Sequence, residues 1–172
     1  MRLIILIAIA LLLSFLCCVN IEKIDQPESV KAGDVFKVTI TGAIGDTSNS
    51  EGQQYYGILG VLVPKDWKVS DVKYSNSVNG EMVQKDRLSM AIDLEYPAPD
   101  GYVWYGFITR DVCSITKEMT NTKVVLDFKI MTGKKKGTYN LDYRLGACTK
   151  PEIIASDLIW GEFLEPITID VK

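Results

Sequence analysis

Apolar and polar residues alternate along most of the chain after residue 20. In the segment VFKVTIT, every second residue from Phe36 to Ile40 is apolar, and the residues between them are lysine or threonine. A period of two places one set of side chains on a core and the other in water, as in a half-buried β-strand. The same alternation predicts strands over 87–95, 123–130, 139–146 and 167–171.

Turn-forming residues separate these segments, as in KAGD, SNSVNGE, PAPDG and TGKKKG. No helical period of useful length lies between them. About eight or nine short strands joined by such frequent turns predict an all-β fold, an antiparallel β-sandwich of immunoglobulin-like topology. A closed barrel is the alternative.

Two predicted strands, YYGILGVLVP (55–64) and YVWYGFI (102–108), are apolar on both faces. Such a strand is either covered on both sides or exposes an apolar surface. We expect a long loop or the terminal segment to pack over one sheet. In the alternative, Tyr102 and Trp104 form an exposed aromatic platform for a glycan or a protein, because flat aromatic rings give a large contact area at low entropic cost.

The chain opens with Arg2 and an apolar run, residues 3–16, that only Ser14 interrupts. These 14 residues are too few for a membrane-spanning helix, which needs about 20, and fit the apolar region of an export signal, about 7–15. No A-x-A-type cleavage site follows; the run ends in two cysteines instead.

The segment LLLSFLCCVN resembles a bacterial lipoprotein signal, in which the chain is cut before a cysteine that receives diacylglycerol. The resemblance implies lipidation of Cys18, which the small Cys17 precedes, although that family prefers leucine where Phe15 stands. Cys17 is the other candidate, and plain secretion or an uncleaved N-terminal anchor are the alternatives. The predicted organisation is a signal peptide over 1–17, a tether over 18–27 and one β-sandwich domain over 28–172.

Composition limits the function. With 47% hydrophobic and 24% charged residues and a net charge of −3, the chain is an ordinary globular protein with no electrostatic attraction for nucleic acid. It contains no histidine, the commonest general base and zinc ligand. In an exported domain Cys113 and Cys148 either form a disulfide or stay as two buried thiols; a catalytic thiol is disfavoured because no histidine is present to activate it.

The loop GAIGDTSNSEGQQ (42–54) is polar and rich in glycine, and such loops often hold function. Asp46, Asn49 and Glu51 carry oxygens suited to calcium, but the order D-x-[DN]-x-[DN]-G of a calcium loop is missing. We therefore expect a solvated loop that is a candidate binding surface, with no metal and no cofactor.

Carboxylates offer a route to hydrolysis. Asp93 and Glu95 share the outer face of their predicted strand, and Asp111 follows another. Outward-facing acids on strands are routine, so a carboxylate-dependent hydrolase is the least favoured hypothesis.

Four segments together resemble cohesin-like β-sandwich modules of bacterial surface proteins: SVKAGDVFKVTI, GILGVLVPKDWKVSDVKYS, YPAPDGYVWYGF and KVVLDFKIMTGKKKGTYNLDYRLG. The resemblance implies an adhesion, scaffolding or carbohydrate-associated domain rather than an enzyme. The function we expect is an exported, lipid-anchored, non-catalytic surface domain that binds a protein or glycan partner. A structural subunit of a cell-surface complex is the alternative.

Overall fold

The computed structural model describes residues 19–45, 51–75, 79–150, 152 and 157–172. The expected signal peptide, Cys17 and Cys18, and Asp46 and Asn49 lie outside these residues, so the expectations for them stay predictions. The described strands are β1 (Val19–Asp25), β2 (Ser29–Val30), β3 (Val35–Ile44), β4 (Gln54–Pro64), β5 (Lys68–Ser75), β6 (Asn79–Gln84), β7 (Tyr102–Thr109), β8 (Cys113–Ser114), β9 (Lys123–Met131), β10 (Gly137–Cys148), β11 (Leu158–Trp160) and β12 (Ile167–Val171). The helical segments are α2 (Asp86–Glu95) and the short 3-10 helix η1 (Lys117–Met119).

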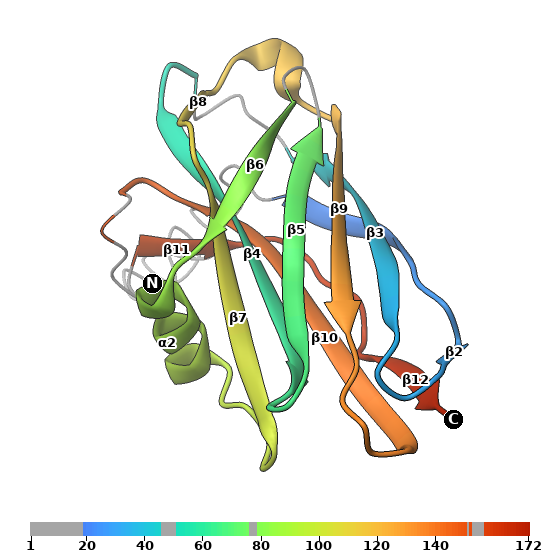
Figure 1. The fold of residues 1–172 in the computed structure, drawn as a ribbon. Helices are drawn as coiled ribbons and strands as arrows, with labels where there is room; N and C mark the ends of the chain where they lie inside the picture. The colour runs from blue at the N-terminus through green and yellow to red at the C-terminus, as the bar shows by residue number, and fades with distance from the viewer. Residues whose placement is uncertain (1–18, 46–50, 76–78, 151, 153–156) are drawn as a thin grey trace, which may run out of the picture.

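The strands form one sheet that folds back on itself into two layers (Figure 1). One layer has the order β1-β3-β9-β5, and the other the order β7-β4-β10-β12-β2. Strand β6 pairs with β5 and with β7, so it joins the layers along one edge. Apart from β2 with β12, the pairs between described strands are antiparallel. The prediction of an antiparallel β-sandwich is confirmed.

The main core lies between the two layers and is built from the alternating residues. Val38, Ile40 and Phe128 are at most 1% exposed, whereas Lys37, which directly precedes Val38, faces water. Trp67, which is 1% exposed, closes one part of this core with edge-to-face contacts to Phe36 and Tyr139, at centroid distances of 6.4 and 5.1 Å. The period of two therefore located this core correctly.

The prediction of a strand over 87–95 is wrong, because this segment forms helix α2. The helix buries Leu88, Ala91 and Ile92, which are spaced i, i+3 and i+4, and leaves Met90 66% exposed and Leu94 77% exposed. Leu88 and Ile92 satisfy a period of two as well as the helical period, so alternation alone did not separate the two structures.

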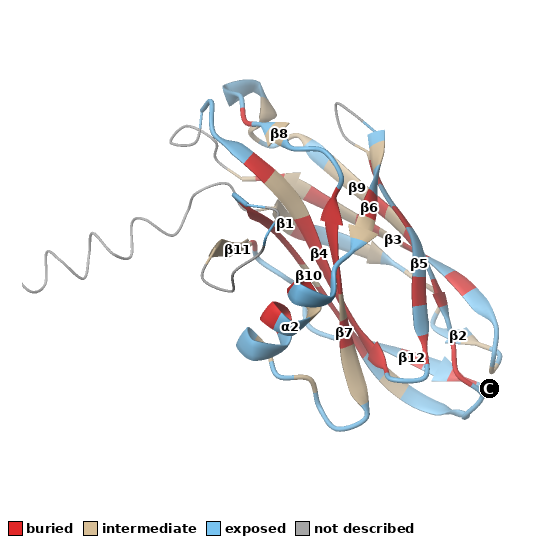
Figure 2. Ribbon diagram, turned by 60° about the vertical axis from the view of Figure 1, so that its left-hand side comes forward, coloured by how far each residue is buried: buried red, intermediate tan, exposed pale blue. Residues whose placement is uncertain are grey.

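Helix α2 packs on the outer face of β7 (Figure 2). The close approach occurs at Gly106, where an added Cβ would lie 2.7 Å from Cγ of Leu88 and 2.7 Å from the backbone nitrogen of Ser89. The backbone N–H of Gly106 donates a hydrogen bond to Oγ of Ser89 at 2.9 Å, and Lys85 N–H donates to the Gly106 carbonyl at 2.9 Å. Only glycine leaves room for this contact.

A second hydrophobic core fills the space under α2. It contains Ile58 and Leu62 of β4, Trp104 and Ile108 of β7, and the buried face of the helix. The expectation that a strand apolar on both faces is covered twice is therefore met. The main cover is a helix rather than a loop or the terminal segment, although Trp160 of β11 also packs there.

The tether expected over 18–27 needs correction for residues 19–25. These residues form β1, which pairs antiparallel with β3 and buries Ile21 to 5% exposure. The first described residues are therefore part of the sandwich. Within the described part of the chain, no helix has the length and apolar character needed to cross a membrane.

Candidate functional site

Strand β10 carries two charged side chains on the face that points away from the main core. Asp142 and Arg144 are two residues apart, so they share a face, while Tyr143 between them points into the main core. The side chain of Asp142 is 8% exposed and that of Arg144 is 12% exposed. Arg144 donates from Nη2 and Nε to Oδ2 of Asp142, at 2.6 and 3.2 Å. The result is an ion pair that is largely shielded from water.

Aromatic rings cover this ion pair. Cζ of Arg144 lies 4.6 Å from the ring centroid of Tyr96 and 3.5 Å from that of Phe163, within the range of cation–π contacts. Tyr96 directly follows α2, and Phe163 lies between β11 and β12. Tyr96 also makes edge-to-face contacts with Trp160 and Phe163, at 5.8 and 6.0 Å. Segments far apart in the sequence thus hold the guanidinium in place.

The ion pair leaves two buried polar atoms without a hydrogen bond. Among the described residues, neither Oδ1 of Asp142 nor Nη1 of Arg144 has a partner. A buried donor or acceptor that stays unpaired costs about 1–3 kcal/mol, and more when it is charged. Burial raises the pKa of Asp142 even though Arg144 beside it acts in the opposite direction. Oδ1 of Asp142 can therefore still accept a hydrogen bond, and Nη1 of Arg144 can still donate one.

Asp142 and Arg144 line a groove of about 510 Å³. Its walls include the side chains of Tyr96, Pro97, Pro99, Tyr102, Asn140 and Pro166. Leu62 and Trp104 also line it, together with the ion pair. The groove thus combines a mostly apolar wall with an ion pair in which one acceptor and one donor have no partner among the described residues, which is the usual composition of a site for a small ligand.

Tyr102 and Trp104, the aromatic pair considered as a binding platform, have different environments in the structure. Tyr102 is half-buried and lines the groove, where its hydroxyl accepts a 3.4 Å contact from the backbone N–H of Asn140. Trp104 is only 3% exposed, and its Nε1 donates to the carbonyl of Tyr96 at 2.7 Å. Trp104 is therefore part of the second core and not part of an exposed platform.

Of the candidates in the 42–54 loop, Glu51 lies in the described part of the chain, and it does not line the groove. Glu51, the one of the three that the structure describes, is exposed and pairs with Lys117 at 2.9 Å. The described residues contain no group of three histidine, cysteine, aspartate or glutamate side chains placed to hold a metal ion.

Cys113 and Cys148 are free thiols in the structure; Cys148 is buried, and Cys113 is partly buried. Cys113 pairs with Tyr55 and Cys148 with Tyr56, on opposite sides of β4. Two strand spacings separate them by about 9–10 Å, beyond the usual Cα separation in a disulfide. Adjacent residues of β4 also point to opposite faces. Burial raises the pKa of Cys113 and raises that of Cys148 to about 11, so neither is an activated nucleophile.

Two of the three carboxylates considered for hydrolysis, those of Asp93 and Glu95, make structural contacts. Asp93 and Glu95 lie on α2 and not on a strand face, which corrects their expected placement. Oδ1 of Asp93 accepts from the backbone N–H of Ala98 at 2.9 Å, and Oε2 of Glu95 accepts from Nε1 of Trp160 at 2.7 Å. Asp111 is exposed, and its carbonyl accepts from the hydroxyl of Thr109 at 2.9 Å.

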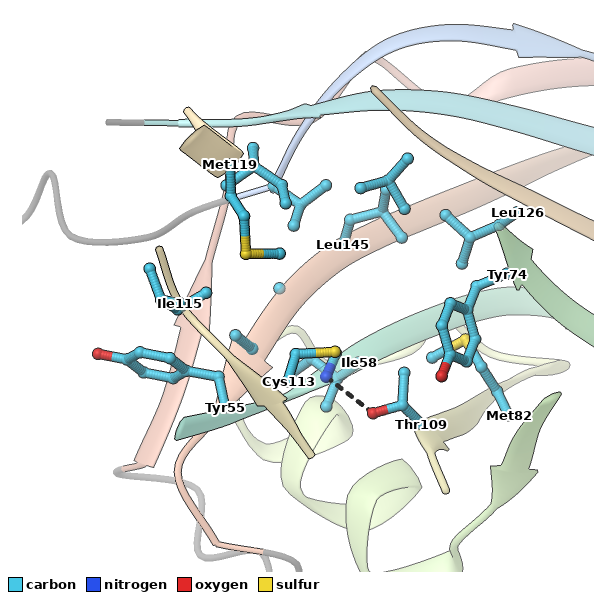
Figure 3. A pocket seen from close by; sticks show the side chains of 16 residues that line it. Tyr55, Ile58, Tyr74, Met82, Thr109, Cys113, Ile115, Met119, Leu126 and Leu145 are labelled. Atoms are coloured by element: carbon cyan, nitrogen blue, oxygen red, sulfur yellow. Dashed lines mark hydrogen bonds between the residues drawn. The ribbon is translucent and has the colours of Figure 1, made fainter. Parts of the chain in front are cut away.

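A second cavity, of about 80 Å³, lies between the layers near β8 and η1 (Figure 3). Apolar side chains from both layers surround it, including Met82, Met119 and Leu145. Its polar contact is internal: the N–H of Gly57 donates to Oγ1 of Thr109 at 3.1 Å (Figure 3). This small cavity has the character of a gap in core packing, whereas the groove presents polar groups to a ligand.

Sequence reasoning missed Asp142 and Arg144 because charged residues on the outer face of a strand normally face water. A signal was present in the neighbouring strand. Strand β4 is apolar on both faces, and its Leu62 and Gly60 pair directly with Asp142 and Arg144. Because β4 is covered on both faces, charged residues of the strand paired with it lie under the same cover and are buried as well.

A family model described as "Domain of unknown function (DUF4961)" matches residues 19–98, which is less than half of the chain. No curated protein matches the chain.

Several solved structures are similar in fold. A cohesin module from a family 33 glycoside hydrolase of Clostridium perfringens has 12% identity and a TM-score of 0.48, over 91% of this chain and 98% of that one. The major pilin SpaA of Corynebacterium diphtheriae has 10% identity and a TM-score of 0.47, over 87% of this chain and 37% of that one. AvmM, described as catalysing macrocyclization in alchivemycin A biosynthesis, has 12% identity and a TM-score of 0.46, over 88% of each chain. With TM-scores below 0.5, these similarities carry no argument about what the chain binds or catalyses.

Proposed function

We propose that this protein is an exported, non-catalytic binding module, anchored by a lipid on Cys18, whose groove beside Asp142 and Arg144 binds a glycan or protein partner. One observation carries the proposal: Asp142 and Arg144 line a groove, and within this ion pair Oδ1 of Asp142 and Nη1 of Arg144 are buried and have no partner among the described residues. A ligand that supplies both hydrogen bonds removes an existing energetic cost, which makes such a groove a favourable binding site.

Binding fits the side chains better than catalysis does. Both described thiols have raised pKa values, and the carboxylates of Asp93 and Glu95 are engaged in hydrogen bonds. Asp142, whose pKa is also raised, is fixed by Arg144 on one oxygen. A rigid, partly desolvated ion pair orients a ligand without requiring a chemical step.

The anchor and the domain are close in the chain. Cys18 immediately precedes β1, which is paired from Val19 onward. The start of β1 contacts the segment that leads to the groove: Ile21 N–H donates to the Glu162 carbonyl at 2.9 Å, and Glu162 N–H donates to Oδ1 of Asn20 at 2.9 Å. A lipid on Cys18 therefore holds the sandwich near the membrane, with the Phe163 side of the groove toward the anchored end.

Two experiments test the proposal. In a bacterial host grown with a fatty-acid analogue, the wild type and Cys17→Ala should incorporate label, and Cys18→Ala should not. For binding, the full chain in mild detergent is applied to arrays of glycans and of peptides, together with the double variant Asp142→Leu/Arg144→Met. Loss of binding in the double variant, with retention in Lys37→Met at the exposed Lys37–Asp127 pair, supports the groove. No binding on either array, or binding that the double variant keeps, overturns it.

An assembly subunit is the second candidate, and one observation favours it. Met90 and Leu94 lie one turn apart on the outer face of α2 and are 66% and 77% exposed. An apolar pair of this kind is typical of a contact surface between chains. If it joins two copies, sedimentation of the full chain in detergent will show a dimer that Leu94→Glu converts to a monomer; a monomer at all concentrations contradicts this candidate.

A further inference from the structure

The two unpartnered atoms in the groove define a specific pattern for a ligand. Oδ1 of Asp142 accepts a hydrogen bond and Nη1 of Arg144 donates one, and the hydrogen bonds to Oδ2 hold the two side chains together. A matching ligand group must donate and accept at neighbouring positions. Two groups do so without carrying charge: adjacent hydroxyl groups and a carboxamide.

The electrostatics of the groove disfavour a charged ligand. Asp142 and Arg144 cancel each other, and the carboxylates nearby are Glu95, which lines the groove, and Glu165, whose charge acts on Asp142. These acids oppose an anion. A cationic donor such as an ammonium has no lone pair and offers no acceptor to Nη1 of Arg144. A neutral group that both donates and accepts avoids both problems.

The floor of the groove disfavours an extended peptide. Leu62 of β4 is paired with Asp142 of β10 on one side and with Trp104 of β7 on the other. The floor therefore consists of side chains over a paired sheet, and a peptide cannot add to it as a strand, because strand addition needs a free edge.

The walls suit a sugar ring. Tyr102 and three prolines, Pro97, Pro99 and Pro166, line the groove with flat or rigid apolar surface, and Asn140 adds an exposed polar group. A pyranose has apolar C–H faces and a rim of hydroxyl groups, so its faces match these walls while its rim reaches the ion pair. The volume of about 510 Å³ falls within the range of about 300–1,000 Å³ that is usual for small-ligand sites.

From these observations, and resting on the proposed role of the groove, we infer that its ligand is a neutral saccharide, with one hydroxyl donating to Oδ1 of Asp142 and an adjacent hydroxyl oxygen accepting from Nη1 of Arg144. The aromatic cover from Tyr96 and Phe163 keeps Arg144 in place for this contact. Uncharged hexose-containing oligosaccharides are the ligand class, and acidic glycans and carboxamide-bearing peptides are not.

The test is calorimetry and array binding with the full chain in mild detergent. The probes are neutral oligosaccharides of glucose, galactose and mannose, sialylated and sulfated glycans, and peptides rich in glutamine and asparagine. Asp142→Asn keeps the shape of the side chain and removes its charge, so it should weaken neutral-glycan binding about tenfold or more, the size expected for a hydrogen bond to a charged group. Lys37→Met should bind as the wild type does. Raising salt from 50 to 500 mM should leave the affinity nearly unchanged.

Each other outcome has a definite meaning. Binding of the glutamine- and asparagine-rich peptides that Asp142→Asn weakens would overturn the saccharide assignment and leave the groove as a binding site. Binding limited to acidic glycans and lost at high salt would overturn the neutral-ligand assignment in the same way. If Asp142→Asn leaves neutral-glycan binding unchanged, the ion pair does not contact the glycan, and the inference is overturned. If none of the probes binds, the proposed function itself is overturned.

Discussion

Replacing Arg144 with methionine probes the buried ion pair directly. The change leaves the Asp142 carboxylate, 8% exposed, without its counter-charge and without the hydrogen bonds to Oδ2. Breaking one side of a buried pair typically costs about 3–5 kcal/mol of unfolding free energy. A domain of this size is stable by about 5–15 kcal/mol, so the loss is a large share, equivalent to about 6–20 °C in Tm.

Urea unfolding of the full chain in mild detergent, followed by tryptophan fluorescence, measures this loss. The midpoint should fall while the slope m stays constant, since the surface exposed on unfolding hardly changes. The matched control is Lys37→Met, because the Lys37–Asp127 pair has side chains 63% and 44% exposed. An exposed pair of that kind contributes about 0–1 kcal/mol.

The stability lost in Arg144→Met should also depend on pH. Burial raises the pKa of Asp142 above its ordinary value of 3.8. A raised pKa means that the folded state binds the proton more tightly, so the group favours folding below pH 3.8 and this contribution is lost as the pH rises through the raised value. Without Arg144 the pKa rises further, so the stability deficit of Arg144→Met should shrink as the pH is lowered from 7 toward 4.

Two results would refute this reasoning. A loss below about 1 kcal/mol, equal to that of the control, would mean that the pair is solvated in solution. A full loss that is the same at pH 7 and pH 4 would mean that the contacts of the guanidinium with the rings of Tyr96 and Phe163 are responsible, and not the charge on Asp142.

The remaining predictions concern the helix and the thiols. Leu88→Ala should cost about 2–5 kcal/mol in urea unfolding because Leu88 is fully buried, whereas Met90→Ala, 66% exposed, should change stability by less than about 0.5 kcal/mol. Gly106→Ala should destabilise by about 1–3 kcal/mol and make α2 more susceptible to limited proteolysis, because the new Cβ meets Leu88 and Ser89 at 2.7 Å; unchanged cleavage would contradict the close packing. Without reductant, peptide mapping after alkylation should find Cys113 and Cys148 both modified, with Cys148 reacting faster as the pH rises toward its pKa of about 11; a disulfide-linked peptide would contradict the strand arrangement.

The main core could be predicted from sequence because it depends on one local rule. In β3, β9 and β10, alternate residues are apolar, and the structure buries them as the period of two requires. Segment 86–95 broke the rule because Leu88 and Ile92, four residues apart, fit a strand and a helix equally well. Tertiary packing decided the structure there: the second apolar face of β7 needs a cover, and a helix with three buried residues supplies it.

The candidate site was outside the reach of local rules. Asp142 and Arg144 stand in a strand pattern that places them outward, and their burial comes from Tyr96 and Phe163, which lie 48 and 19 residues from Arg144 along the chain. No pattern in the sequence around β10 predicts those contacts. Tyr102, in contrast, was a candidate in the alternative that its strand, apolar on both faces, exposes an aromatic platform, and it lines the groove.

Stability alone does not account for the ion pair. Replacing a buried pair with apolar residues of similar size is often neutral or stabilising by about 1–4 kcal/mol, so Asp142→Leu/Arg144→Met should fold as well as the wild type. The fold needs a cover over β4 and β7, which α2 and Trp160 provide, but that cover does not need charges beneath it. A group that the fold does not require, and that leaves one donor and one acceptor unmatched beside a groove, is best explained by a ligand that matches them.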